Sequence, residues 1–238
     1  MLDSGLMFLQ STFHCPDGSL HLFQEALDAA FPPDADANLI RGVSEGIFLA
    51  DSTMKSAGFL QSTVGLDVRG HVRRAGILYR LHEMAGAGDL PFSSIMSKMP
   101  RGNWHWIELQ SKNFTAHVCR TDAPEAFPDD TPTRQDERVT NQPDFFEDNS
   151  SVVPIKGYLA WLTFGIGDSG ALGHLCWGMP KASEDVWLAR TNVIRRAEMN
   201  EKIVPIERAD MRAKVKFRDH IEETVLKKSS ENLDTTPE

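Results

Sequence analysis

The sequence predicts an α+β fold with helices first, an antiparallel sheet in the centre and a charged helix near the C-terminus. Apolar residues recur every three or four positions in the first third of the chain, which is typical of helices. Alternating apolar and polar residues, broken by turn sequences, dominate between residues 104 and 189. We expect residues 1–120 and 152–228 to form one domain, since 238 residues with 41% hydrophobic content can bury one core.

Two helices are expected before residue 50. The first covers residues 20–31, with Ser19 as its N-cap and Pro32 and Pro33 as its stop. The second covers residues 36–49, although two glycines lower its helix propensity.

The clearest helical pattern runs from Val68 to Ala85 and ends at a glycine-rich stop sequence. Apolar residues form one stripe along it, and the remaining faces carry Arg69, Arg73, Arg74 and Arg80. Two interpretations stay open for these arginines: a solvated helix flank, or a contact to phosphate or to an acidic partner.

Two β-hairpins account for the expected central sheet. Each pairs two alternating segments across a short turn, which is the usual signature of antiparallel strands. A further strand is expected after the second hairpin. The segments are Trp104–Leu109 with Phe114–Arg120, then Tyr158–Ile166 with Ala171–Trp177, and finally Val186–Ala189.

The segment 121–151 between the hairpins is rich in proline and acidic residues, and the sequence predicts a disordered acidic loop there. A charged helix is expected at about residues 210–228, where apolar positions are sparse. The polar residues 229–238 are expected to form a disordered tail.

A five-residue stretch, Gln142-Pro143-Asp144-Phe145-Phe146, stands out inside that acidic segment. Two adjacent phenylalanines on a flexible tether are typical of a linear binding motif, in which aromatic anchors fill a partner's pocket. The stretch resembles the pentapeptide that binds bacterial sliding clamps: glutamine, any residue, serine or aspartate, an aliphatic or aromatic residue, then phenylalanine. Alternatively, Phe145 and Phe146 dock back onto the sheet.

A chain without catalytic motifs that carries this pentapeptide resembles the SocB-type toxins of bacterial toxin–antitoxin pairs. The resemblance implies a non-enzymatic inhibitor of DNA replication in the bacterial cytoplasm, which competes with polymerase and repair factors for the clamp. It implies Gln142 as the polar head, Asp144 as the third-position acid, and Phe145 and Phe146 as the pocket anchors. It also implies a cognate antitoxin or a protease adaptor as a second partner.

Two other functions stay open. Asp89 followed by Glu108 on a strand resembles the metal-binding acids of PD-(D/E)XK nucleases, although Gln110 stands where that family has lysine. An adaptor or antitoxin without a clamp contact is the other alternative, with the arginine-bearing helix as a candidate surface.

Composition narrows the classes of ligand. The formal net charge of −9 argues against broad contact with nucleic acid or anionic membrane. No apolar run approaches the length of about 20 residues that a membrane span needs. Two His-x-Cys pairs, His117/Cys119 and His174/Cys176, could form a zinc site only if their strands were adjacent, so we expect no metal and no cofactor.

Overall fold

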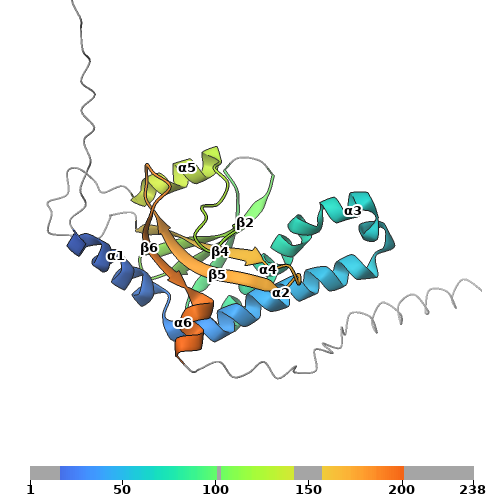
Figure 1. Cartoon of the computed structure of the whole chain (residues 1–238), viewed down its shortest axis with the longest axis horizontal. Helices are drawn as coiled ribbons and strands as arrows, with labels where there is room; N and C mark the ends of the chain where they lie inside the picture. Colours follow the sequence, from blue (N-terminus) through green and yellow to red (C-terminus); the bar gives the residue numbers. More distant parts are fainter. Residues whose placement is uncertain (1–16, 101–102, 142–156, 201–238) are drawn as a thin grey trace, which may run out of the picture. The chain divides into compact units, whose positions relative to one another are not determined.

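A computed structural model of the chain describes residues 17–100, 103–141 and 157–200. They form an α+β fold built on a six-stranded sheet, as the sequence predicts (Figure 1). The helices are α1 Asp17–Ala30, α2 Asp36–Ser56, α3 Thr63–Asp67, α4 Arg69–Ala87, α5 Pro132–Arg138 and α6 Val193–Met199, with short 3-10 helices η1 Pro33–Ala35, η2 Gly58–Gln61 and η3 Val139–Asn141. The strands are β1 Ser93–Lys98, β2 His105–Ser111, β3 Phe114–Arg120, β4 Tyr158–Ile166, β5 Leu172–Pro180 and β6 Trp187–Asn192.

The six strands lie in the sheet in the order in which they occur along the chain. Both expected hairpins are present, β2 with β3 and β4 with β5, and β1 and β6 extend them at the two edges. The expectation of an antiparallel sheet is wrong at its centre, however, because β3 and β4 are parallel, with Phe114 beside Tyr158 and Arg120 beside Phe164. Parallel strands cannot be joined by a tight turn, since the chain must first return along the length of the strand.

The return path explains why the predicted disorder is wrong for residues 121–141. This segment crosses the face of the sheet opposite α1, α2 and α4, and it includes α5 (Figure 1). Phe127 packs against Trp161 and Trp187 on that face, with ring centroids 6.0 and 4.1 Å apart. Composition alone predicted disorder because it could not show that one aromatic residue of this segment, Phe127, packs on two tryptophans of the sheet.

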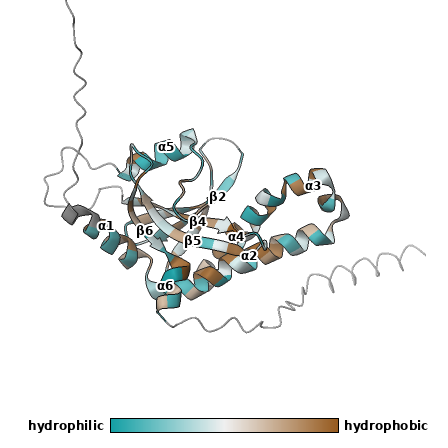
Figure 2. Ribbon diagram, viewed as in Figure 1, coloured by the Kyte–Doolittle hydropathy of each residue, from teal (hydrophilic) through white to brown (hydrophobic). Residues whose placement is uncertain are grey.

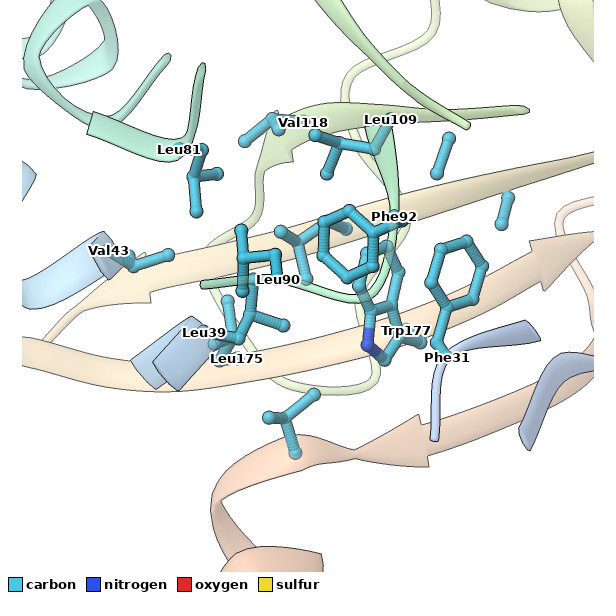
Figure 3. Packing of buried hydrophobic residues seen from close by; sticks show 14 of the residues in the cluster. Phe31, Leu39, Val43, Leu81, Leu90, Phe92, Leu109, Val118, Leu175 and Trp177 are labelled. Atoms are coloured by element: carbon cyan, nitrogen blue, oxygen red, sulfur yellow. The ribbon is translucent and has the colours of Figure 1, made fainter. Parts of the chain in front are cut away.

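The main core lies on the other face of the sheet, where strand alternation directs every second side chain toward the helices. Phe31 from the end of α1 stacks on Trp177 of β5 at 3.8 Å between ring centroids, and Phe92 meets both rings edge-on. In Figure 3 these rings lie on one side of Leu90, and Leu39 and Val43 of α2 and Leu81 of α4 lie on the other. Phe31 and Leu81 belong to apolar stripes that the helical periodicity predicted, whereas no stripe was predicted for α2.

Helices α2 and α4 lie side by side and form an arm, with η2 and α3 at its tip (Figure 1). Helix α2 continues to Ser56, beyond the expected end at residue 49, and the tip was not predicted at all. The two glycines that weakened the prediction for α2 are buried in it. A Cβ atom at Gly46 would lie 2.6 Å from the Cα of Ile77, and one at Gly76 would lie 2.4 Å from the carbonyl oxygen of Gly46. Glycine is therefore what allows the two helix backbones to touch.

Two smaller differences concern the ends of the described chain. Helix α1 already begins at Asp17, so Ser19 lies inside the helix and is not its cap. Sequence analysis also missed α6, which follows β6 directly and is capped by the side chain of Asn192.

The charged helix expected at residues 210–228 and the tail 229–238 lie outside the described residues. None of the described helices combines the length and the apolarity that crossing a membrane requires.

Candidate binding surfaces

The residues of the clamp-like motif, Gln142, Pro143, Asp144, Phe145 and Phe146, lie outside the residues that the structure describes. The residues on both sides of segment 142–156 are described. They show how the fold holds the last described residue before the motif and the first described residues after it.

Asn141 fixes the point of departure. Its side chain is buried, and its amide nitrogen donates to the carbonyl oxygens of Leu159 and Pro180 at 2.9 and 2.8 Å. Its amide oxygen accepts from the backbone N–H of Leu159 at 2.8 Å. One side chain therefore joins η3 to both β4 and β5, directly before the first residue of the motif.

Gly157 and Tyr158 fix the point of return. The N–H of Tyr158 donates to the carbonyl oxygen of Asn113 at 2.7 Å, at the turn between β2 and β3. Gly157 has a φ of +77°, and a Cβ atom there would lie 2.5 Å from the same oxygen. Since Asn141 is bonded to Leu159, two residues past Gly157, both ends of segment 142–156 are held at the start of β4.

Helix α5, which precedes the motif, is itself docked on the sheet. The Nδ1 atom of His117 lies 3.1 Å from a carboxylate oxygen of Glu137, and the indole N–H of Trp161 donates to the same oxygen at 3.4 Å. The indole ring of Trp106 stacks on the imidazole of His117, with ring centroids 4.0 Å apart. Arg138 is buried and forms ion pairs with Asp130 and Asp185. The motif thus follows a helix that hydrogen bonds and ion pairs hold against the sheet.

The arginines of α4 are mostly committed within the fold. Arg73 forms two hydrogen bonds of 2.8 Å with the carboxylate of Asp51 on α2. Arg80 donates to Glu45 on α2 at 2.6 Å, and Arg74 donates to the carbonyl oxygen of His105 at 3.0 Å. Arg73, Arg74 and Arg80 thus bind groups of this chain, which differs from both expectations, a solvated flank and a contact to an outside phosphate or acidic partner. Arg69 forms no ion pair with any described residue, and it lies at the tip of the arm.

The two candidate nuclease acids occupy different local settings. Asp89 follows the C-terminus of α4, 3.6 Å from a guanidinium nitrogen of Arg41. Glu108 lies in the middle of β2 and accepts a hydrogen bond from the indole N–H of Trp106 at 3.2 Å. Across residues 17–100, 103–141 and 157–200, no three His, Cys, Asp or Glu side chains converge in a way that could hold a metal ion.

The two His-x-Cys pairs lie on one face of the sheet but not on adjacent strands, because β4 separates β3 from β5. His174 shares a hydrogen bond of 2.9 Å with the hydroxyl of Thr121. Burial raises the pKa of the Cys119 thiol to about 11, so this sulfur stays protonated at neutral pH. These groups lie between the sheet and segment 121–141 and pack the two together.

Comparison with protein-family models, with curated proteins and with solved structures finds no match to this chain. The candidate sites therefore stand on their own geometry. Sequence reasoning missed two of their features: Asn141 as the anchor of the motif segment, and the tip of the arm. A lone asparagine gives no signal in a sequence. The apolar residues between positions 59 and 68 lie between two expected helices, and they could have been noticed as a possible surface.

Proposed function

We propose that this protein binds the bacterial DNA sliding clamp through Gln142-Pro143-Asp144-Phe145-Phe146 and inhibits replication by occupying the pocket that polymerase and repair factors use. The motif itself is the observation that carries the proposal. Two adjacent aromatic anchors behind a polar head are suited to a hydrophobic pocket with a polar rim. The protein would act in the cytoplasm and would need no active site.

The geometry on both sides of the motif supports the proposal. Asn141 and Gly157 hold the two ends of segment 142–156 at the start of β4, so a partner can engage the segment without separating any strand pair. Because Gln142 follows a buried residue directly, the clamp would have to approach the end of the sheet where η3 lies.

The expected affinity determines how much of the protein inhibition requires. Five residues bury little area, and ordering them costs free energy on binding, so we expect a dissociation constant in the range of about 1 µM. Inhibition at that affinity depends on abundance. Removal of the protein by a cognate antitoxin or a protease adaptor would then relieve it.

Clamp binding can be measured by titrating the full chain into a purified bacterial sliding clamp, using calorimetry or fluorescence polarisation. We expect the Gln142→Ala/Phe146→Ala variant to lose binding, because it removes both the polar head and the terminal anchor. A peptide that carries the clamp-binding consensus should displace the wild-type chain. Replication of a primed template by polymerase and clamp should slow in proportion to clamp occupancy.

Ser150→Ala/Ser151→Ala is the matched control, since it alters the same segment outside the motif and should bind as the wild type does. Equal binding by the wild type and by the Gln142→Ala/Phe146→Ala variant would refute the assignment of these residues. Absence of binding by the wild type would refute the clamp as the partner.

A further inference from the structure

The tip of the arm exposes large apolar side chains. The residues between α2 and α4 form η2 and α3, which pack on each other and on these two helices. Phe59 is 73% exposed, Val64 is 77% exposed, and Leu66 and Val68 are also exposed. Figure 2 shows hydrophobic and hydrophilic residues side by side around α3. Exposed apolar residues gathered within ten positions of the chain indicate a contact surface.

The tip has a defined shape. Ser62 caps α3 by accepting a hydrogen bond from the N–H of Gly65, and Gly65 is buried against the backbone of Phe59 and Leu60. A Cβ atom at Gly65 would lie 2.4 Å from the carbonyl oxygen of Phe59. The side chain of Gln61 donates to the carbonyl oxygen of Lys55 at 2.6 Å and so covers the C-terminal end of α2. The exposed residues therefore sit on a preorganised support.

An open hollow of about 390 Å³ lies at the tip, lined by residues of α2, η2, α3 and α4. Met54, Leu60 and Leu66 supply its apolar lining, and Lys55 and Arg69 supply positive charge. Neither cation forms an ion pair with any residue that the structure describes. The one acid in the lining, Asp51, is held by Arg73, and this hydrogen bond keeps the pKa of the Asp51 carboxyl below its usual value. Lys55 and Arg69 also lower this pKa, but three cations, Lys55, Arg69 and Arg73, face this single acid, so the mixed lining keeps a net positive charge.

We propose that this hollow binds an acidic amphipathic segment of another protein, with an apolar side chain inserted between Met54 and Leu66 and carboxylates bound by Lys55 and Arg69. The combination of charge and apolarity selects this occupant. A nucleic acid would meet a chain of net charge −9, and a neutral apolar peptide would leave both cations unpaired. Helices and extended peptides with apolar anchors bind grooves of this kind. The site does not include the clamp-like motif.

The test is a selection of peptides on the full chain. A phage-displayed library of random peptides of about 16 residues, long enough for four helical turns, is the probe. Enriched peptides should carry Asp or Glu next to Leu, Ile or Phe. Their affinity, measured by fluorescence polarisation, should fall about tenfold or more for Arg69→Glu and for Leu66→Asp, because each change removes one of the two attractions.

Arg195→Glu is the matched control for charge, since Arg195 is an exposed arginine on α6, outside the arm. It should bind the peptides as the wild type does, as should Gln142→Ala/Phe146→Ala. Circular dichroism checks that the two tip variants stay folded, which their exposed positions favour.

Three results would overturn the proposal. The first is no enrichment, or enrichment of peptides without acidic residues. The second is retained affinity in both tip variants. The third is a concentration-dependent dimer of the wild type that Phe59→Asp abolishes, which would assign the tip to a second copy of this chain.

Discussion

Burial sets the protonation state of single residues on the face of the sheet that segment 121–141 covers. The ring of His174 lies where a side chain at position 165 would stand, since a Cβ atom at Gly165 would be 2.0 Å from its Cε1 atom. Burial lowers the pKa of His174 below its ordinary value of 6.5, and Arg190 lowers it further. The hydroxyl of Thr121 is its hydrogen-bond partner. The folded protein therefore favours the neutral imidazole.

This shift predicts a pH dependence of stability. The unfolded chain binds a proton at His174 at higher pH than the folded chain does, so the free energy of unfolding is greatest above pH 6.5 and declines as the pH falls below it. One group can contribute a slope of at most about 1.4 kcal/mol per pH unit. Urea unfolding between about pH 7.5 and 5 should show a smaller slope for His174→Gln than for the wild type. Equal slopes would assign the dependence to other groups.

Asn141 shows at the same scale how one residue can position a candidate site. Its three hydrogen bonds join η3 to β4 and β5. Because these contacts are polar, a hydrophobic pattern in the sequence does not predict them. The motif that follows is readable from the sequence. Its attachment point is not, because the partners of Asn141 are 18 and 39 residues away along the chain.

At the scale of elements, the arm depends on where its glycines lie. At Gly46 and Gly76 the backbones of α2 and α4 leave no room for a Cβ atom, whereas a Cβ atom at Gly86, also in α4, would meet nothing within 4 Å. The ion pairs Arg73–Asp51 and Arg80–Glu45 connect the same two helices on either side of this contact. The helices therefore pack through backbone contact at the centre and charge pairs at the flanks.

The same substitution should have opposite effects at two of these glycines. Gly46→Ala forces the helices apart and should lower the free energy of unfolding by about 1–3 kcal/mol. Gly86→Ala should raise it by about 0.5–1 kcal/mol, because alanine loses less conformational entropy in a helix. Urea unfolding of both variants checks the prediction. A stabilising Gly46→Ala would contradict the backbone contact.

At the scale of the whole molecule, one arginine connects the beginning of the described chain to its end. Arg196 of α6 binds the carboxylate of Asp36 through two hydrogen bonds of 2.7 and 2.8 Å. It also donates to Asp28 of α1 at 2.6 Å and to the carbonyl oxygen of Phe31 at 2.9 Å. Asp36 is only 1% exposed, so its charge depends on this partner.

Removing the cation should destabilise the fold as a unit. Arg196→Met leaves a buried carboxylate without its partner, and breaking such a pair costs about 3–5 kcal/mol. The neighbouring Arg195→Met should change the stability by less than about 0.5 kcal/mol, because Arg195 is exposed. Calorimetric melting of both variants makes the comparison. Equal melting temperatures would mean that α6 does not hold α1 and α2 in place.

Local patterns predicted the parts that depend on neighbours in sequence. The stripe that includes Leu78 and Leu81 located α4, and the alternation around Ile107 and Leu109 located β2, although it did not show which face of β2 meets the core. Prediction was poorest where a residue's partner is distant. No local pattern indicates that Phe127 would meet Trp161 and Trp187, and the composition of segment 121–141 predicted disorder there.

By itself, the sequence determined the α+β class, the two hairpins, the principal helices and the motif at residues 142–146, since each follows from spacing between near neighbours. Only the tertiary structure decided that β3 and β4 are parallel, that segment 121–141 covers the sheet, and that Lys55 and Arg69 border one hollow together with Met54 and Leu66. Strand direction and the meeting of distant side chains depend on how the whole chain buries its apolar surface, and periodicity within one segment carries no information about that.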